Sequence, residues 1–398
     1  MGVMDVFDTI KAISASDHNE FLDAAIKGGA GVIGYFCSYV PEEIIHASGM
    51  VPYRMRAVNS GGTRKGSVYY SALNCSFVRA CFGKVLEGDF SFLNGIVFMN
   101  GCDHIRRMYD NWKYADVPPD FRHMFVAPHV TGDTAHARFT AEIRTFARAI
   151  EGHFGVFITD ESLRESIRLY NKKRRLLVEL YSFRKGKIVP IKGSEVLSLM
   201  LAVTMMPVTD AMALIEEVIA ALPGRAASRD GDIRIYLASG CMEEREHLEL
   251  IESCGGAIVA DSMCLGARHF DLEVEEKGDP WESLARRYLE HLSCPRMMNE
   301  FRSRLDRLHR TRDEYAIDAV IGEKLKFCDL WGGDLYLMKQ ESRKKRFPIL
   351  LLERELYGGG DGQIRTRVQA FFEQVRNNIY SDTGIFRAIG ADRQAGSN

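Results

Sequence analysis

The cysteines are the residues of this chain best suited to chemistry, because five of the nine follow predicted apolar strands. These five are Cys37, Cys102, Cys241, Cys264 and Cys328. The carboxyl ends of parallel strands meet at one edge of a sheet, and ligands of open α/β proteins bind there. Cysteines that only fill space in a core would instead be scattered along strands and helices. The clustering therefore predicts a shared thiolate site.

The spacing of the cysteines restricts the kind of site. No Cys-x-x-Cys pair occurs, which argues against a zinc ribbon and against a thioredoxin-type redox pair. The closely spaced cysteine run of bacterial ferredoxins is also missing. Single cysteines from distant loops can still hold a cluster, and soft thiolate ligands suit iron–sulfur centres. We therefore favour a thiolate-bound metal cluster over simple buried thiols.

Other catalytic motifs are missing from the sequence. The stretch GGTRKGS at Gly61–Ser67 contains glycines and a lysine but lacks the spacing of a P-loop. The chain also has no Gly-x-Ser-x-Gly nucleophile elbow and no His-Glu-x-x-His zinc motif. His46 and His104 are single histidines, and we interpret each as structural or surface-exposed rather than as a metal ligand.

The composition is that of an ordinary globular protein with more than one domain. The chain has 398 residues, of which 46% are apolar and 27% are charged, and its net charge is -2. A typical domain has ~100–200 residues, and a nearly neutral chain has no global field that attracts nucleic acid. No apolar stretch reaches the ~18 residues that a membrane span needs. Since the N-terminus also lacks a signal-peptide pattern, we expect a cytoplasmic protein without nucleic-acid or membrane partners.

Strand and helix patterns alternate at both ends of the chain. Residues 1–140 are predicted to form a first α/β domain, with strands at Ala30–Phe36, Gly95–Met99 and His123–Ala127. Residues 141–225 are predicted to form a helical domain, because two capped helices occur there without a comparable strand.

The alternation returns in residues 226–398, the predicted second α/β domain. Its strands are expected at Ile233–Leu237, Ala257–Ala260, Ala316–Ile321 and Phe347–Leu352. The stretches YFCSYVPEEIIHASG and ASGCMEEREHLELIESCGG share the order strand, cysteine junction, Glu-Glu, helix and glycine. The pattern predicts an α/β fold class, with two Rossmann-like parallel-sheet domains and an intervening helical domain.

Several long motifs resemble the 2-hydroxyacyl-CoA dehydratase family, which includes the ATP-dependent benzoyl-CoA reductase subunits and the double-cubane cluster proteins. They occur in order along nearly the whole chain: GYFCSYVPEEIIHASGMVPYRM, NCSFVRACFG, NGCDHIRRMYDNW, GGAIVADSMCLGARHF, KFCDLWGGD and PILLLERELYGGGDGQIRTRVQAFFE. The resemblance implies two Rossmann-like domains, a helical domain and an iron–sulfur cluster at the domain interface.

The resemblance also implies an activity and partners. Such a subunit pairs with a related subunit, and a separate ATP-hydrolysing iron–sulfur activator protein delivers single low-potential electrons. In a dehydratase the electron enters a 2-hydroxyacyl-CoA, a ketyl radical forms, hydroxide leaves and the electron is returned. In a benzoyl-CoA reductase the electrons stay in the reduced ring. An acyl-CoA is the expected substrate of this radical enzyme, and a non-catalytic scaffold of the same fold is the alternative from another class.

The three cluster ligands of the family correspond to Cys75, Cys102 and Cys328. This implies a 4Fe–4S cluster with one iron that has no cysteine ligand. Such an iron can act as a Lewis acid beside the group being reduced. Cys75 precedes a predicted helix, whose N-terminus would stabilise a thiolate.

Cys37, Cys241 and Cys264 keep a second interpretation open. With the first three cysteines they would be enough for an 8Fe–9S double cubane, as in the homodimeric ATP-dependent reductases of small molecules within the same superfamily. Cys241 is not expected in an ordinary dehydratase subunit, whereas Cys37 and Cys264 taken singly are interpreted as buried thiols near the cluster. The remaining cysteines are expected on helices in the core: Cys81, Cys254 and Cys294.

Three residues are candidate proton donors. Glu43 lies with Glu42 at a predicted helix start, where stabilisation of the helix dipole is the simpler role. Asp103 and His104 begin the helix after Cys102, and they either cap it or deliver a proton to the substrate. The next two basic residues, Arg106 and Arg107, are interpreted as partners in surface salt bridges.

The glycine loop of GGGDGQIRTR opens the last predicted helix. Gln363, Arg365, Thr366 and Arg367 occupy the first turns of that helix. A helix start of this kind suits an anion such as a CoA phosphate. A packing turn between domains is the alternative interpretation.

Overall fold

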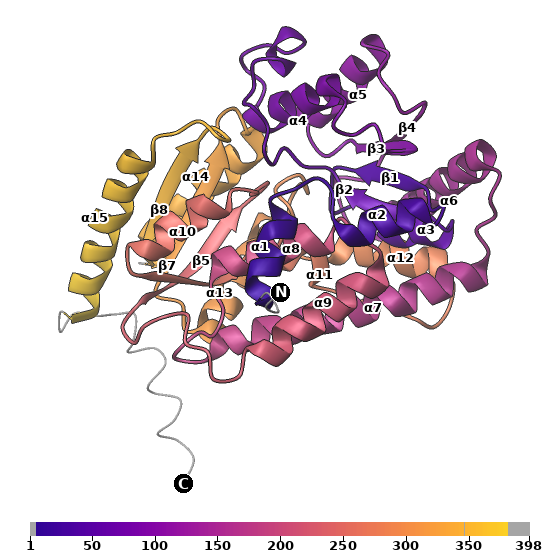
Figure 1. Cartoon of the computed structure of the whole chain (residues 1–398). Coiled ribbons are helices and arrows are strands. Elements are labelled where there is room, and N and C mark those ends of the chain that lie inside the picture. Colours follow the sequence, from indigo (N-terminus) through magenta and orange to yellow (C-terminus); the bar gives the residue numbers. More distant parts are fainter. Residues whose placement is uncertain (1–4, 346, 381–398) are drawn as a thin grey trace.

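The computed structural model describes residues 5–345 and 347–380 and contains two four-stranded parallel sheets (Figure 1). The strands of the first sheet are β1 (Val32–Tyr35), β2 (Val51–Arg54), β3 (Gly95–Met99) and β4 (Phe121–Phe125). Those of the second are β5 (Ile233–Ser239), β6 (Gly256–Asp261), β7 (Ala319–Leu325) and β8 (Ile349–Arg354). Their spatial orders are β2-β1-β3-β4 and β6-β5-β7-β8, so the two sheets have the same topology. The predicted α/β fold class is confirmed.

The α-helices of the described residues connect and cover these sheets. Their bounds are α1 (Val6–Ser14), α2 (Glu20–Lys27), α3 (Glu42–Ala47), α4 (Ser76–Glu87), α5 (Asp103–Tyr114), α6 (Asp133–Phe154), α7 (Asp160–Ser182), α8 (Gly193–Val203), α9 (Val208–Ala221), α10 (Arg245–Ser253), α11 (Ala267–Phe270), α12 (Pro280–Glu290), α13 (Phe301–Tyr315), α14 (Asp329–Lys345) and α15 (Asp361–Tyr380). None of the helices in these described ranges is long and apolar enough to cross a membrane.

Helices cover both faces of the second sheet. Successive residues of a strand point to opposite faces, so the core that each residue joins shows which helices cover its face. In β5, Ile235 and Leu237 belong to the same apolar core as side chains of α10 and α15. The intervening residues Tyr236 and Ala238 belong to a core formed with α13 and α14. The sheet is therefore buried on both sides, which is usual for parallel sheets.

Strand β2 is absent from the sequence-based prediction because Pro52 interrupts its pattern. Proline has no N–H donor, so sheets tolerate it mainly on edge strands. β2 is the edge strand of the first sheet, with Pro52 aligned to Ile33 of β1. The other predicted strands are present: Gly95–Met99 is found unchanged as β3, whereas the rest have shifted ends, such as His123–Ala127, which is found as β4 at Phe121–Phe125.

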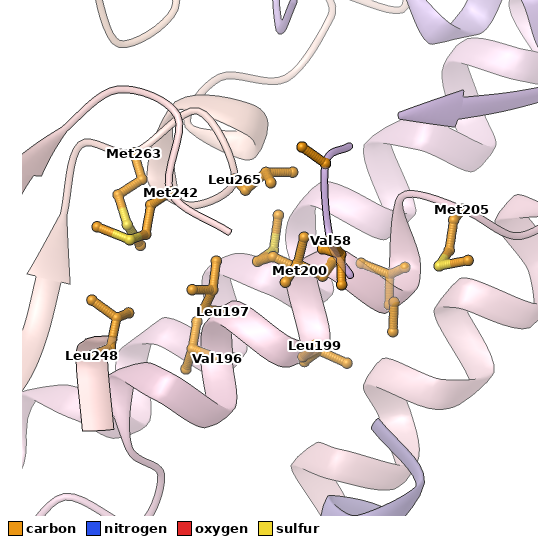
Figure 2. Close-up of a cluster of buried hydrophobic side chains, with 14 of the residues drawn as sticks. Val58, Val196, Leu197, Leu199, Met200, Met205, Met242, Leu248, Met263 and Leu265 are labelled. Atoms are coloured by element: carbon orange, nitrogen blue, oxygen red, sulfur yellow. The ribbon is translucent and has the colours of Figure 1, made fainter. Parts of the chain in front are cut away.

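Helix α8 supports two of the loops that carry cysteines. All of its residues from Val196 to Val203 are buried, as expected of a helix that is apolar on every side. Figure 2 shows Met242 and Met263 next to this helix, and both belong to the same buried cluster. Met242 follows Cys241 and Met263 precedes Cys264 in the chain. Packing against α8 therefore helps to fix the loops after β5 and β6.

Candidate metal centre

The cysteine loops lie at the switch points of the two sheets. In each sheet the chain places its second strand on one side of the first strand and its third strand on the other. Open α/β sheets bind ligands at such points. Cys37 and Cys102 follow the two strands that flank this point in the first sheet, and Cys241 and Cys328 do so in the second. With Cys264 after β6, the predicted placement of five cysteines beyond strand ends is confirmed.

Cys75, Cys102 and Cys328, called the helix-cap thiols below, occupy equivalent positions relative to a helix. Cys75 is the N-cap of α4 and Cys102 is the N-cap of α5, both with an extended backbone. The carbonyl oxygen of Cys328 accepts the N–H of Gly332 at 2.9 Å and so begins α14 in the same way. An N-cap side chain faces the unpaired N–H groups of the first helical turn. The fold thus supplies each of these sulfurs with backbone donors.

The helix-cap thiols share one buried neighbourhood. Burial raises the pKa of Cys75 to about 12 and that of Cys328 to about 11, and first-turn backbone N–H groups act in the opposite direction. Burial also raises the pKa of Cys102, which interacts electrostatically with both other thiols. The metal-free thiols are therefore neutral at ordinary pH, and a metal would have to displace their protons.

The chemistry of these donors is that of iron–sulfur ligands, because soft thiolates are the usual ligands of such clusters. Among residues 5–345 and 347–380, no three His, Cys, Asp or Glu side chains converge closely enough to hold one metal ion. A structural zinc site needs four ligands on one atom, with sulfur at about 2.3 Å. An iron–sulfur cluster instead binds its cysteines on separate irons. The donor set of the helix-cap thiols therefore fits such a cluster.

Further contacts fix the loop that carries Cys75. The N–H of Cys75 donates to Nδ1 of His104 at 3.3 Å, which ties this loop to α5. On the other side, the N–H of Leu356 donates to Oγ of Ser76 at 2.7 Å. An ion pair between α4 and the segment after β8 adds to this link, with 3.4 Å between Arg79 and Glu355. These contacts join the first sheet's helices to the loops of the second sheet.

The other cysteines of the site face two arginines, and we call them the arginine-facing thiols: Cys37, Cys241, Cys264 and Cys294. Arg54 ends β2 and interacts electrostatically with the first three. Arg268 lies in α11 and donates from Nη1 to the sulfur of Cys264 at 3.4 Å. It also interacts with Cys294. Sequence reasoning missed both arginines although each lies within a quoted family motif, because their position beside the cysteines depends on the fold.

The predicted location of Cys294 on a helix is wrong. It lies in the loop after α12 rather than on a helix, and it interacts electrostatically with Cys264 and Cys37. Its place in the site was hidden because the sequence gives no strand before it. Cys81 lies buried within α4, as predicted. Cys254 caps the end of α10, where its sulfur contacts the carbonyl oxygen of Leu250 at 3.3 Å.

Glu43 lies in a buried ionic network rather than at an exposed position. Arg174 of α7 forms an ion pair with it, and the hydroxyl of Tyr288 donates to it at 2.7 Å. Although burial alone would raise the pKa of Glu43, Arg174 and Arg287 hold it below the ordinary value. Glu43 is thus ionised and ties α3 to α7 and α12. Its assignment as a proton donor stays a prediction.

His104 and Asp103 have different surroundings, although they are adjacent. Asp103 is exposed and forms an ion pair with Arg106 at 3.0 Å. His104 is half-buried, and burial lowers its pKa against the opposing charges of Asp329 and Asp103. Asp329 follows Cys328, so His104 lies among the segments of all three helix-cap thiols. Of the two candidate proton donors, His104 is therefore the one that bonds to the loop of another helix-cap thiol, whereas Asp103 is exposed.

The residues predicted to bind CoA phosphate lie exposed at the start of α15. Arg365 donates to Oγ of Ser253 at 3.0 Å, and Arg367 donates to the carbonyl oxygen of Leu351 at 2.7 Å. Thr366 donates to the carbonyl oxygen of Gly362 within the helix. These bonds attach the start of α15 to α10 and β8 within the second sheet's own unit. The anion-binding role of Gln363 and its neighbours and the packing role between domains both stay predictions.

Comparison with known proteins adds independent findings. The family model described as 2-hydroxyglutaryl-CoA dehydratase, D-component, matches residues 37–375. The chain is 30% identical over 271 residues to one of the benzoyl-CoA reductase subunits of Thauera aromatica, covering 65% of this chain and 68% of that relative. It is 23% identical over 372 residues to the beta subunit of lactoyl-CoA dehydratase of Anaerotignum propionicum, covering 93% and 98%. Identity to the beta subunit of (R)-2-hydroxyglutaryl-CoA dehydratase of Acidaminococcus fermentans is 22% over 386 residues, covering 94% and 100%.

Proposed function

Because the chain belongs to the 2-hydroxyglutaryl-CoA dehydratase D-component family, we propose that it is an iron–sulfur subunit of an ATP-activated radical enzyme that acts on an acyl-CoA. The reaction is either dehydration of a 2-hydroxyacyl-CoA or reduction of a benzoyl-CoA-type ring, since relatives named for both activities match. The observation that carries the proposal is the electrostatic interaction among three helix-cap thiols that come from both sheets.

In this proposal the helix-cap thiols hold a 4Fe–4S cluster, which when bound supplies single electrons and an iron without a cysteine ligand. The first-turn N–H groups of α4, α5 and α14 hold negative charge on the three sulfurs. Nδ1 of His104 accepts the N–H of Cys75, so the proton of the neutral ring sits on Nε2. That N–H is the available proton donor beside the centre.

The proposal includes two protein partners and a place for the substrate. Relatives named as beta subunits imply a partner subunit, which is a related chain in a heterodimer or a second copy in a homodimer. The family resemblance implies a separate ATP-hydrolysing iron–sulfur activator that supplies the electrons, and this sequence itself has no P-loop. The phosphates of the acyl-CoA are assigned to Gln363, Arg365, Thr366 and Arg367 at the start of α15.

Turnover by the anaerobically assembled complex tests this function. The chain, its partner subunit and the activator are incubated with ATP and with each acyl-CoA class in turn. A dehydrated acyl-CoA or a ring-reduced product supports the respective reaction. Replacing Cys102 with serine should abolish turnover, whereas Cys254→Ser, at a cysteine outside the site, should not. An iron-loaded complex that converts neither class of acyl-CoA would contradict the proposal.

A homodimeric double-cubane reductase of small molecules is a second candidate, because the arginine-facing thiols lie beside the helix-cap thiols. Cys241 interacts electrostatically with Cys75, and Cys328 does so with Cys264 and Cys294. Iron analysis separates the two candidates: about four irons per chain indicate a single cubane and about eight indicate a double cubane. A chain that binds no iron after anaerobic reconstitution would favour the non-catalytic scaffold.

A further inference from the structure

Two buried arginines of the site form no ion pair within the described residues, although Arg54 interacts electrostatically with the buried carboxyl of Glu243. Arg54 is 5% exposed and Arg268 is 0% exposed. Nη1 of Arg54 has no hydrogen-bond partner, and neither have Nε and Nη2 of Arg268. No carboxylate of residues 5–345 or 347–380 forms an ion pair with either guanidinium. A buried charge without a close anionic partner is destabilising, so a further anion beside these guanidiniums would stabilise the fold.

The other buried arginines of the described chain show the contrast. Each contacts a carboxylate or backbone carbonyl oxygens: Arg56, Arg174, Arg184, Arg287, Arg296 and Arg354. Some nitrogens of Arg56, Arg184, Arg296 and Arg354 are also unpartnered, but each of these arginines has an oxygen acceptor that Arg54 and Arg268 do not have.

The two guanidiniums lie mainly among sulfur atoms and aromatic rings, and the carboxyl of Glu243 also interacts with Arg54. Arg268 donates to the sulfur of Cys264 at 3.4 Å, and its guanidinium carbon lies 5.6 Å from the ring centre of Trp331. Trp331 is in the first turn of α14, the helix that Cys328 begins. Arg54 lies over the ring of Tyr35 at 5.3 Å and interacts with Cys37, Cys241 and Cys264. The two cations thus border the same space as the seven cysteines of the site.

We infer that Arg54 and Arg268 are the counter-cations of the redox group and set its reduction potential. The inference rests on the proposed function, because the anion that they face is the thiolate-bound cluster. Each electron that the cluster accepts adds one negative charge, while no bond to either arginine forms or breaks. A nearby positive charge in a low-dielectric site stabilises that added charge and raises the potential. The arginines are positioning residues, since they act on the cluster and not on the substrate.

An EPR-monitored redox titration of the anaerobically purified holoprotein tests the inference. Arg268→Met and Arg54→Met remove a charge, and Arg268→Lys and Arg54→Lys keep it. Each Met variant should shift the electron equilibrium about tenfold toward the oxidised cluster, which is ~59 mV lower in a one-electron couple. The Lys variants should stay near the wild-type potential. Arg287→Met is the matched control, because Arg287 is equally buried but donates to the carbonyl oxygens of Leu272 and His269.

The outcomes separate this inference from the proposed function. If a Met variant loses iron while its Lys counterpart keeps it, the charge holds the anionic group, and the inference stands. If both variants keep iron with the wild-type potential, or both lose iron alike, the inference is overturned. Wild-type protein that carries iron but converts no acyl-CoA overturns the proposed function alone. Wild-type protein without iron overturns both the cluster assignment and this inference.

Discussion

The helix-cap thiols and the arginine-facing thiols lie in one site, but different groups of the protein balance negative charge on their sulfurs. The sulfurs of the first set face backbone N–H groups at the start of α4, α5 and α14. Those of the second set face the guanidinium groups of Arg54 and Arg268. Backbone amides are fixed by the helix and carry only partial charge, whereas a guanidinium carries a full charge. The first arrangement suits permanent ligands, and the second suits a place where the charge changes during the reaction.

Of the replacements that test this difference, removal of a helix-cap thiol should have the largest effect on iron content and turnover. Cys102→Ala removes the N-cap sulfur of α5, and the other two helix-cap thiols cannot replace it from α4 and α14. We expect loss of nearly all cluster iron and of turnover, with the fold retained. Iron and acid-labile sulfide per chain, measured with far-ultraviolet circular dichroism, provide the check. Cys254→Ser is the control, and full iron in Cys102→Ala would break the distinction between the two sets.

The ionic network around Glu43 offers a third mode of compensation, in which opposite full charges are paired. Glu43→Gln leaves Arg174 buried without its partner, and breaking a buried pair in this way costs about 3–5 kcal/mol. The pKa of folded Glu43 lies below the ordinary value of 4.5. Its stabilisation is therefore present above the pKa of the unfolded chain and is lost as the pH falls through the folded pKa.

Urea unfolding at several pH values checks this prediction. The difference between wild type and Glu43→Gln should be constant near neutral pH and should shrink only below about pH 4.5, the ordinary pKa of the carboxyl. Iron content should not change, because Glu43 belongs to the network of α3, α7 and α12. A variant of normal stability that has lost turnover would instead support the proton-donor role.

The sequence predicted the part of the site that depends on local pattern. Apolar strands followed by cysteines located Cys37, Cys102, Cys241, Cys264 and Cys328, because the carboxyl edge of a parallel sheet follows from strand order alone. Strand β2 escaped notice because Pro52 hides an edge strand. Arg54 at the end of β2 was missed with it, since its role depends on a position in space and not on a motif.

Cys294 is a second residue whose place in the site could not be predicted from local sequence pattern. It enters the site from a loop that follows α12, and only the packing of α11 and α12 brings it to Cys264. Similarly, the ion pair of Glu43 depends on α7, which lies more than a hundred residues away in the chain. Contacts between distant elements are set by the assembled fold, so no local spacing reveals them.

Replacing Cys294 should have a smaller effect than replacing a helix-cap thiol. In a single-cubane protein, Cys294→Ser keeps the iron content and changes only the surroundings of Arg268. We expect unchanged iron per chain and a shift of the reduction potential smaller than that of Arg268→Met. Cys81→Ala, within the core of α4, tests whether loss of any buried thiol has this effect. Loss of about half the iron in Cys294→Ser would support the double cubane.

The exposed face of α5 should give the smallest effect, because water compensates its charges. Arg107 is 61% exposed on its side chain and forms an ion pair with Asp110 at 2.7 Å, which confirms the predicted surface salt bridge. Such pairs contribute only ~0.2–1 kcal/mol. We expect Arg107→Ala to leave the unfolding midpoint, iron content and reduction potential unchanged, although Cys102 begins the same helix. If turnover fell only when the activator protein is limiting, this face of α5 would be a docking surface for the activator. The exposed charges of α5 would then act in binding a protein, whereas the buried arginines act on the cluster.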